Sequence, residues 1–141
     1  MKNRTTFTNN SLKITKPILF IITLLLLSFN ANAQSKKVKA PIIKFEKTVH
    51  DYGTINKNAN GDCEFRFKNT GNEPLILSDV IPSCGCTIPD WPKSPIMPGK
   101  TAVIKIKFDT NRTGSFSKTI TVISNATEDR ITLTVKGNIP S

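Results

Sequence analysis

The 141-residue sequence has few of the side chains on which most catalytic sites depend. It contains one His, one Tyr, one Trp, two Met and three Cys. No H-E-x-x-H zinc motif, P-loop or nucleophile elbow occurs in it. The single histidine, His50, lies in "TVHDYG" without metal-ligand spacing around it, so we expect an ordinary loop side chain. The sequence thus indicates no catalytic residue, and it favours a protein that is not an enzyme.

The chain also lacks an apolar run long enough to span a membrane, which takes about 20 residues. Its longest run, "ILFIITLLLLSF" at 18–29, follows a basic start. Ala31 and Ala33 then provide the small residues that a signal peptidase accepts before a cut at Gln34. We predict that residues 1–33 are a signal peptide and that no membrane span remains after cleavage. The protein is then exported to the periplasm, the cell envelope or the extracellular space.

Acidic side chains are scarce, with 10 Asp and Glu against 20 Lys and Arg. Four of the basic residues precede the cut, which leaves 16 and a net charge of +6. Such a surplus suits an anionic partner, but it is also typical of a well solvated surface. The dense basic stretch "SKKVK" has no interleaved aromatic side chains, as a nucleic-acid groove would need. We expect residues 34–41 to be a flexible basic lead-in, and a partner to be a protein or an envelope polysaccharide rather than a nucleic acid.

The mature chain lacks the 3.6-residue apolar period of helices longer than one turn. Apolar residues alternate with polar ones instead, so that Cys63, Phe65 and Phe67 share one face of a segment. Turn-forming segments such as 69–74 separate these runs. About seven short strands in roughly 100 residues predict a single all-β, immunoglobulin-like β-sandwich over residues 42–141. The expected strands lie near 42–46, 52–55, 62–69, 74–80, 101–109, 116–124 and 130–137.

Cysteine is scarce and odd in number, although free thiols rarely persist in an oxidising compartment. Cys84 and Cys86 are one residue apart, and Cys63 falls near them if the 69–74 turn joins neighbouring strands. A disulfide from Cys63 to Cys84 or Cys86 would close a loop of about twenty residues and stabilise the fold by roughly 3 kcal/mol. We favour such a structural cross-link, or buried thiols.

Two alternatives for the thiols stay open. Cys84 can bond Cys86 in a small ring, which needs a bend at Gly85 and would exchange readily with other thiols. Alternatively, Cys84, Cys86 and Cys63 together can bind a copper ion, because soft thiolates select Cu(I). No other cofactor is expected.

The segment 83–97 is the candidate binding loop. Trp91 lies between two prolines there, so its backbone is extended and stiff, and a tryptophan held in this way can anchor a partner. Gly85 and Met97 complete the candidate loop. The favoured alternative is that the Trp91 ring closes the open end of the sandwich, because aromatic side chains prefer burial. Exposed strand edges are a second candidate binding surface.

The order of several motifs resembles a family of exported bacterial domains, domain of unknown function 1573. The motifs are "FEKTVHDYGTI", "FRFKNTGNEPLILSDVIPSCGCTIPDWPKSPIMPG", "IKIKFDT", "GSFSKTITVISN" and "LTVKG", over about residues 45 to 137. The family is similar to Hydin-type and major-sperm-protein-type domains.

This resemblance implies a β-sandwich, export and a hallmark Cys-Gly-Cys element, but no established reaction. Cys63 departs from the family pattern. We therefore predict an exported, non-enzymatic binding or structural module of the cell envelope. Thiol-based copper binding or thiol–disulfide exchange at Cys84 and Cys86 is the alternative.

Overall fold

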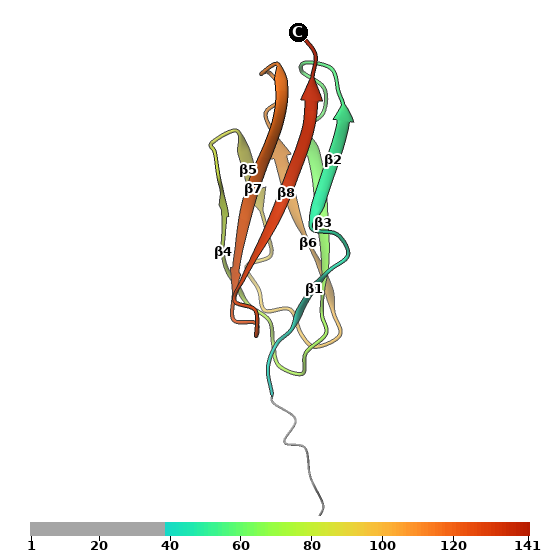
Figure 1. Cartoon of the computed structure of the whole chain (residues 1–141). Coiled ribbons are helices and arrows are strands. Elements are labelled where there is room, and N and C mark those ends of the chain that lie inside the picture. Colours follow the sequence, from blue (N-terminus) through green and yellow to red (C-terminus); the bar gives the residue numbers. More distant parts are fainter. Residues whose placement is uncertain (1–38) are drawn as a thin grey trace, which may run out of the picture. The chain divides into compact units, whose positions relative to one another are not determined.

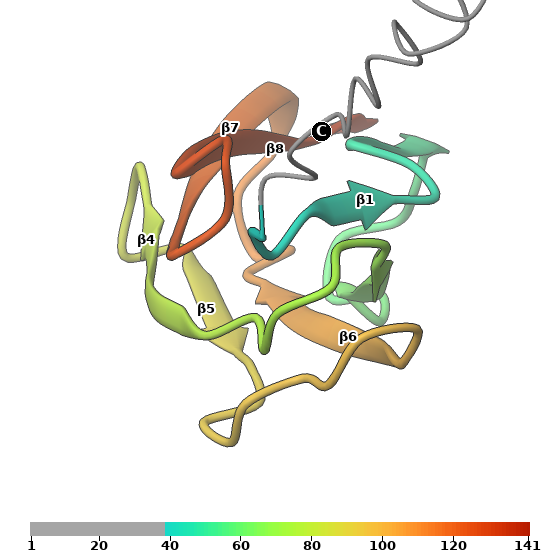
Figure 2. The same ribbon diagram turned by 90° about the horizontal axis from the view of Figure 1, so that it is seen from below.

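Two four-stranded sheets pack face to face in the computed structural model, which describes residues 39–141 (Figure 1). Sheet A has the strand order β1-β3-β6-β5, and sheet B has the order β2-β8-β7-β4. Figure 2 shows β7 and β8 in one layer and β6 in the other. The strands are β1 (Ile43–Phe45), β2 (Val49–Thr54), β3 (Asp62–Asn69), β4 (Leu77–Pro82), β5 (Thr87–Asp90), β6 (Thr101–Phe108), β7 (Gly114–Ser124) and β8 (Arg130–Ile139).

This arrangement confirms the predicted immunoglobulin-like β-sandwich. No helix in the described part of the chain is long and apolar enough to cross a membrane. The predicted signal peptide and most of the basic lead-in lie outside the described residues, so these two predictions stay predictions.

Alternating side chains build the core between the sheets. Burial in β3 changes at every residue, and Phe65 and Phe67 have no exposed surface. Ile104 of β6 lies beside Phe65 in the same sheet. Leu133 and Val135 of β8, in the other sheet, belong to the same core. Each fully buried apolar side chain of this size stabilises the fold by about 1.5–3 kcal/mol. The shared face predicted for Cys63, Phe65 and Phe67 of β3 is therefore confirmed as the inward face.

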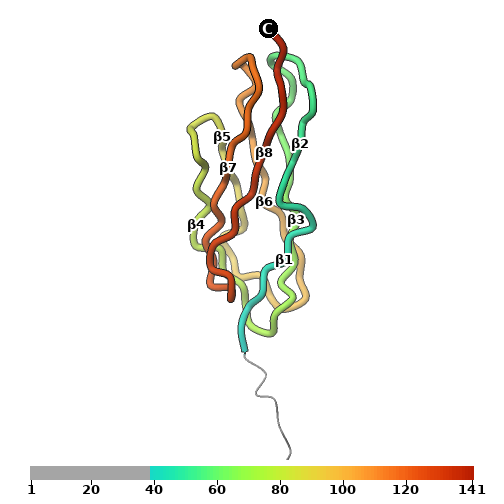
Figure 3. The backbone as a smooth tube through the Cα atoms, viewed as in Figure 1, coloured from blue at the N-terminus to red at the C-terminus, as the bar shows by residue number. Residues whose placement is uncertain are grey.

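The chain changes sheets between its first two strands, a route that the Cα trace follows clearly (Figure 3). β1 pairs antiparallel with β3 at one edge of sheet A, and β2 pairs parallel with β8 at an edge of sheet B. Within β2 the register shifts after Asp51, whose carboxylate accepts the Gly53 N–H at 2.8 Å. Gly53 has φ +62°, a backbone conformation that glycine adopts without strain.

The segment 69–74 does not form the turn between neighbouring strands that the sequence predicted. It carries the chain from β3 in sheet A to β4 in sheet B. The fully buried Asn69 organises this crossing: its Nδ2 donates to the carbonyls of Glu73 and Ile96, and its Oδ1 accepts the N–H groups of Gly71 and Ile42. A polar residue at the end of an alternating strand gives no signal of such a network.

Candidate functional site at the Cys84–Cys86 disulfide

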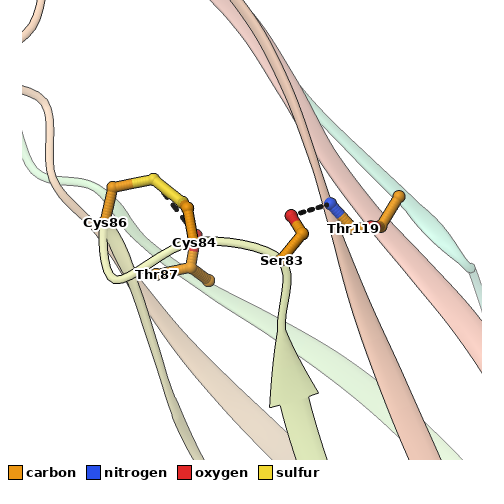
Figure 4. Close-up of a disulfide and its surroundings, with 5 residues drawn as sticks. All are labelled: Ser83, Cys84, Cys86, Thr87 and Thr119. Atoms are coloured by element: carbon orange, nitrogen blue, oxygen red, sulfur yellow. Dashed lines mark hydrogen bonds between the residues drawn. A yellow bond between two sulfur atoms is a disulfide. The ribbon is translucent and has the colours of Figure 1, made fainter.

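Cys84 and Cys86 are joined to each other (Figure 4). Cys63 is free and buried. The Cα atoms of the pair are 5.2 Å apart, an ordinary separation for a disulfide. The chain bends at Gly85 and Cys86, and the Thr87 N–H donates to the Cys84 carbonyl at 3.3 Å across the bend. Of the pairings left open by the sequence, the structure has the small ring, and the favoured cross-link from Cys63 is not formed.

Hydrogen bonds on both sides hold the disulfide loop where the chain crosses from sheet B to sheet A. The Ser83 N–H donates to the Thr119 carbonyl of β7 at 2.8 Å, and Ser83 Oγ accepts the Thr119 N–H at 3.1 Å. At the other end the Cys86 carbonyl accepts the Asp109 N–H at 2.8 Å, just beyond β6. The backbone of the loop is thus attached to both sheets independently of the disulfide.

The hydroxyl of Thr87 lies against both sulfur atoms. Its Oγ1 is 3.7 Å from Cys84 Sγ and 4.0 Å from Cys86 Sγ, and the Thr87 side chain points inward at the start of β5 (Figure 4). Only 2% of Thr87 is exposed. A hydroxyl in this place can donate a hydrogen bond to a sulfur, most strongly to a thiolate. The sequence analysis missed Thr87 because β5 was not predicted.

Two hollows adjoin Cys86. Gly85, Cys86 and Ile88 line the larger hollow, of about 390 Å³, together with the segments 58–62 and 107–111. Cys86 also lines a smaller hollow of about 160 Å³, whose walls include the cationic side chains of Arg112 and Lys118. A Cβ on the exposed Gly85 would meet no atom within 4 Å, and Gly85 does not have a positive φ. The bend therefore does not require glycine, whose effect is to leave the approach to the disulfide uncovered.

Cys63 lies inside the core on β3, with 6% of its surface exposed. Its burial raises the pKa of the thiol, although the Tyr52 hydroxyl opposes the shift. Cys63 is paired with Ile106 of β6, and Ile106 with Pro89 of β5, so β6 separates Cys63 from the strand that follows the disulfide. The expected three-thiol cluster relied on a 69–74 hairpin that is not present.

The same geometry disagrees with the three-thiolate copper site. Two of its three sulfurs are joined in the disulfide, and the described residues contain no group of three or more His, Cys, Asp or Glu that could hold a metal ion. His50 is half-buried with Nδ1 3.0 Å from Lys47 Nζ, and its ring meets Tyr52 edge-on. Burial and then the Lys47 ammonium lower the pKa of His50, while Asp51 opposes them.

A family model described as "Protein of unknown function (DUF1573)" matches residues 43–139. The chain belongs to this family. No curated protein matches the sequence.

Among solved structures, the DUF1573 domain is similar to a protein of unknown function from Porphyromonas gingivalis W83. The TM-score is 0.64 at 19% identity, over 77% of this chain and 51% of that one, so our chain spans about half the length of the relative. It is also similar to the ASH/PapD-like domain 7 of human CEP192, with a TM-score of 0.57 at 9% identity over 75% and 90% of the two chains. The secreted serine protease VesC from Vibrio cholerae has a TM-score of 0.55 at 8% identity, over 70% and 23%. At these identities the likeness shows the fold alone.

Trp91 of the DUF1573 domain packs against the edge of the core and is half-buried. The Lys93 ammonium lies 2.9 Å from the centroid of its ring, so this face is covered. Its buried Nε1 has no hydrogen-bond partner. Met97, by contrast, is 53% exposed beside the buried Ile96. The candidate loop therefore does not bring Gly85, Trp91 and Met97 together as one exposed surface.

Ile88 is an exposed apolar residue of the predicted binding segment 83–97, in which the sequence had pointed to Gly85, Trp91 and Met97 instead. With 63% of its surface exposed, it is the most exposed large hydrophobic side chain among the described residues. It lies on β5, which was expected to be loop because Pro89 and the inward-facing Thr87 interrupt the apolar alternation. The neighbouring outward residues of sheet A are Asp62, Glu64, Asp90, Lys105 and Lys107, which line a shallow hollow of about 440 Å³ with Ile88.

Proposed function

We propose that this DUF1573 protein is an exported, non-enzymatic module of the cell envelope that binds another protein through the surface around Ile88. The exposure of Ile88 between the 390 Å³ and 440 Å³ hollows is the observation that carries the proposal. Charged side chains of both signs surround this apolar side chain. An apolar centre with a polar rim is the composition of a protein-binding surface.

Side chains, rather than strand edges, make this contact. Each of the four edge strands of the described sandwich is short or irregular. β1 has three residues, β2 and β4 contain register shifts, and β5 contains Pro89. Short strands, bulges and prolines oppose the addition of a partner strand. The strand edges are therefore poor binding surfaces, and we propose the outer face of β5, within the segment 83–97, as the binding surface.

Export is supported by the N-terminal sequence pattern and by the compartment that disulfides need. The Cys84–Cys86 bond is consistent with an oxidising location such as the periplasm, the envelope or the extracellular space. Cell fractionation, followed by mass spectrometry of the intact protein, tests the location. We expect a chain that begins at Gln34 outside the cytoplasm, and a cytoplasmic chain that retains residues 1–33 would contradict export.

A photo-crosslinking amino acid at position 88 tests the binding surface in the cells that make the protein. The matched control position is Ile81, which is 45% exposed on β4 of the opposite sheet. We expect a discrete protein adduct from position 88 and none from position 81. A protease-resistant carbohydrate adduct would show that the partner is a polysaccharide and not a protein. Equal adducts at both positions would refute the proposal that the surface around Ile88 is the binding site.

A further inference from the structure

We propose that the Cys84–Cys86 disulfide oxidises a pair of thiols in a partner protein segment that enters the hollow beside Gly85. The exchange site consists of Cys84, Gly85, Cys86 and Thr87. This inference goes beyond the proposed function because it adds a covalent reaction to a binding module. The hollow is the 390 Å³ one that Ile88 also lines, so a segment that enters it would lie beside the proposed binding surface, and the exchange is tested separately from that binding.

A structural role explains this disulfide poorly. In the chain-entropy model the stabilisation grows with the number of residues in the closed loop, and here the two cysteines are only two positions apart. The loop is also fixed without the bond, through Ser83 and Thr119 on one side and through Cys86 and Asp109 on the other. The disulfide therefore constrains a segment that hydrogen bonds already hold.

Access to the two sulfurs is unequal. Cys86 contributes to the walls of both adjoining hollows, whereas Cys84 contributes to neither. The missing side chain at Gly85 keeps the larger hollow open to an approaching chain. A thiolate attacks one disulfide sulfur and expels the other. A partner thiolate that enters from the hollows therefore attacks Cys86 Sγ, and Cys84 is the leaving group.

The surrounding groups favour this direction of attack. Arg112 and Lys118 line the smaller hollow beside Cys86, and cations stabilise the thiolate form of an approaching cysteine. Thr87 Oγ1 lies 3.7 Å from Cys84 Sγ, where it can donate a hydrogen bond to the departing thiolate. Cys63 does not take part because it is buried in the core.

The reaction balances as two thiol–disulfide exchanges. The first partner thiolate bonds Cys86 Sγ, the bond between Cys84 and Cys86 breaks, and the electron pair leaves on Cys84 Sγ, which takes up a proton. The second partner thiolate attacks the partner sulfur of the mixed disulfide and expels Cys86, which is also protonated. Two electrons and two protons pass from the partner dithiol to Cys84 and Cys86. One turnover needs no other oxidant.

The oxidised, full-length exported protein is the reagent for the first test, with a synthetic two-cysteine peptide and dithiothreitol as the two probes. We expect one peptide disulfide per protein molecule and two alkylatable thiols, at Cys84 and Cys86, by mass spectrometry. The circular dichroism spectrum should not change, and Cys63 should stay unalkylated until the protein is unfolded. Failure of the peptide to react where dithiothreitol reacts, or loss of the fold on reduction, would overturn the proposal.

Three variants separate an exchange site from an inert disulfide. Gly85→Leu should keep the fold and slow the peptide reaction about tenfold, with little effect on the smaller dithiothreitol, because the new side chain fills open space. Thr132→Leu, at an exposed position of β8, is the matched control and should react like the parent. Thr87→Val should slow both probes. Equal rates in all variants would refute the assigned roles.

A one-cysteine peptide identifies the attacked sulfur, because it can form only the mixed disulfide. We expect the adduct on Cys86, and an adduct on Cys84 would reverse the assignment. The double variant Cys84→Ser/Cys86→Ser distinguishes this inference from the proposed binding function. It should lose exchange completely but retain the crosslinked adduct from position 88.

Discussion

At the scale of single residues, Asn69 shows how one buried polar side chain joins three segments. Its amide makes four hydrogen bonds, to Ile42, Gly71, Glu73 and Ile96, in a site with no exposed surface. Removing it leaves the N–H groups of Ile42 and Gly71 and the Glu73 carbonyl, all in part-buried hydrogen bonds, without this partner, whereas the Ile96 carbonyl still accepts the Leu75 N–H at 2.9 Å. A buried group left unsatisfied costs about 1–3 kcal/mol. The backbone turns at this end of the sandwich therefore depend on the one side chain.

Asn69→Ala should lower the free energy of unfolding by roughly 3 kcal/mol, because three part-buried backbone groups lose their hydrogen-bond partner together. Urea denaturation provides the measurement. The control is Asn72→Ala, which removes an exposed side chain that accepts one hydrogen bond, from the Ala40 N–H. Its cost should stay below about 1 kcal/mol. Similar losses for both variants would show that the Asn69 network does not stabilise the fold.

His50 gives the stability a dependence on pH. Because burial lowers its pKa from 6.5, the unfolded chain binds a proton more readily than the folded one, and stability falls as the pH drops through about 6.5. Asp51 affects the stability at lower pH. The Gly53 N–H and Lys136 lower the pKa of its carboxyl group from 3.8, so the stabilisation that the carboxylate contributes is lost as it takes up a proton. His50→Gln should therefore reduce the loss of stability between pH 7 and pH 5, measured by urea unfolding. An unchanged loss would contradict this.

The residue scale also shows which details the sequence could predict. The two-residue period placed Phe65 and Phe67 in the core because burial in a strand follows from local alternation. The partner of Cys84 could not be predicted, since it depends on which sheet receives β4 after the crossing at Asn69. The sequence favoured a cross-link from Cys63 and kept the Cys84–Cys86 ring as an alternative, and the structure has the alternative.

At the scale of elements, β5 is the strand that the sequence did not reveal. Its four residues include a proline and an inward threonine, so apolar alternation does not mark it. Its conformation comes from pairing with β6, from Thr87 opposite Phe108 to Asp90 opposite Lys105. This strand carries Thr87 and Ile88, so the predicted segment 83–97 and the Cys84–Cys86 pair were found without these two residues.

The start of β3 packs closely against the end of β6. A Cβ at Gly61 would collide with the Phe108 carbonyl, and it would also crowd Thr110. Gly61→Ala should therefore destabilise the protein by about 1–3 kcal/mol through overpacking, measured by thermal unfolding. Gly85→Ala is the matched control and should stay within about 0.5 kcal/mol of the parent, because its Cβ meets open space. Equal melting temperatures of the two variants would contradict this packing.

At the scale of the whole molecule, the first two strands complete both sheets. β1 covers an edge of sheet A and β2 an edge of sheet B, so their removal exposes β3 and β8 together. A chain that begins at Ile55 should lose cooperative unfolding in calorimetry, since each sheet loses an edge and the core is opened. A chain that begins at Lys39 is the control and should unfold cooperatively. Cooperative unfolding of both chains would show that β1 and β2 are dispensable.

The fold class could be predicted from alternation and turn spacing, and the family match agrees with the resemblance found in the motifs. The order of strands in the sheets could not be predicted. Pairings such as that of β2 with β8 join segments more than eighty residues apart in the sequence, so they leave no local signal. The function is not encoded in a motif with a known reaction. It has to be approached through the surface and the disulfide that the fold brings into place.

The parallel pairing of β2 with β8 has a mechanical consequence. β2 and β8 run in the same direction, and the described chain enters the sandwich near one end, through β1, and leaves β8 at the other (Figure 1). Tension on Lys39 and Ser141 would slide the two strands past each other and load their hydrogen bonds simultaneously. Tension that separates β7 from β8 at their shared turn would instead break bonds one after another. In single-molecule pulling, the first direction should require the higher force, as in a domain that can transmit load between the structures it connects.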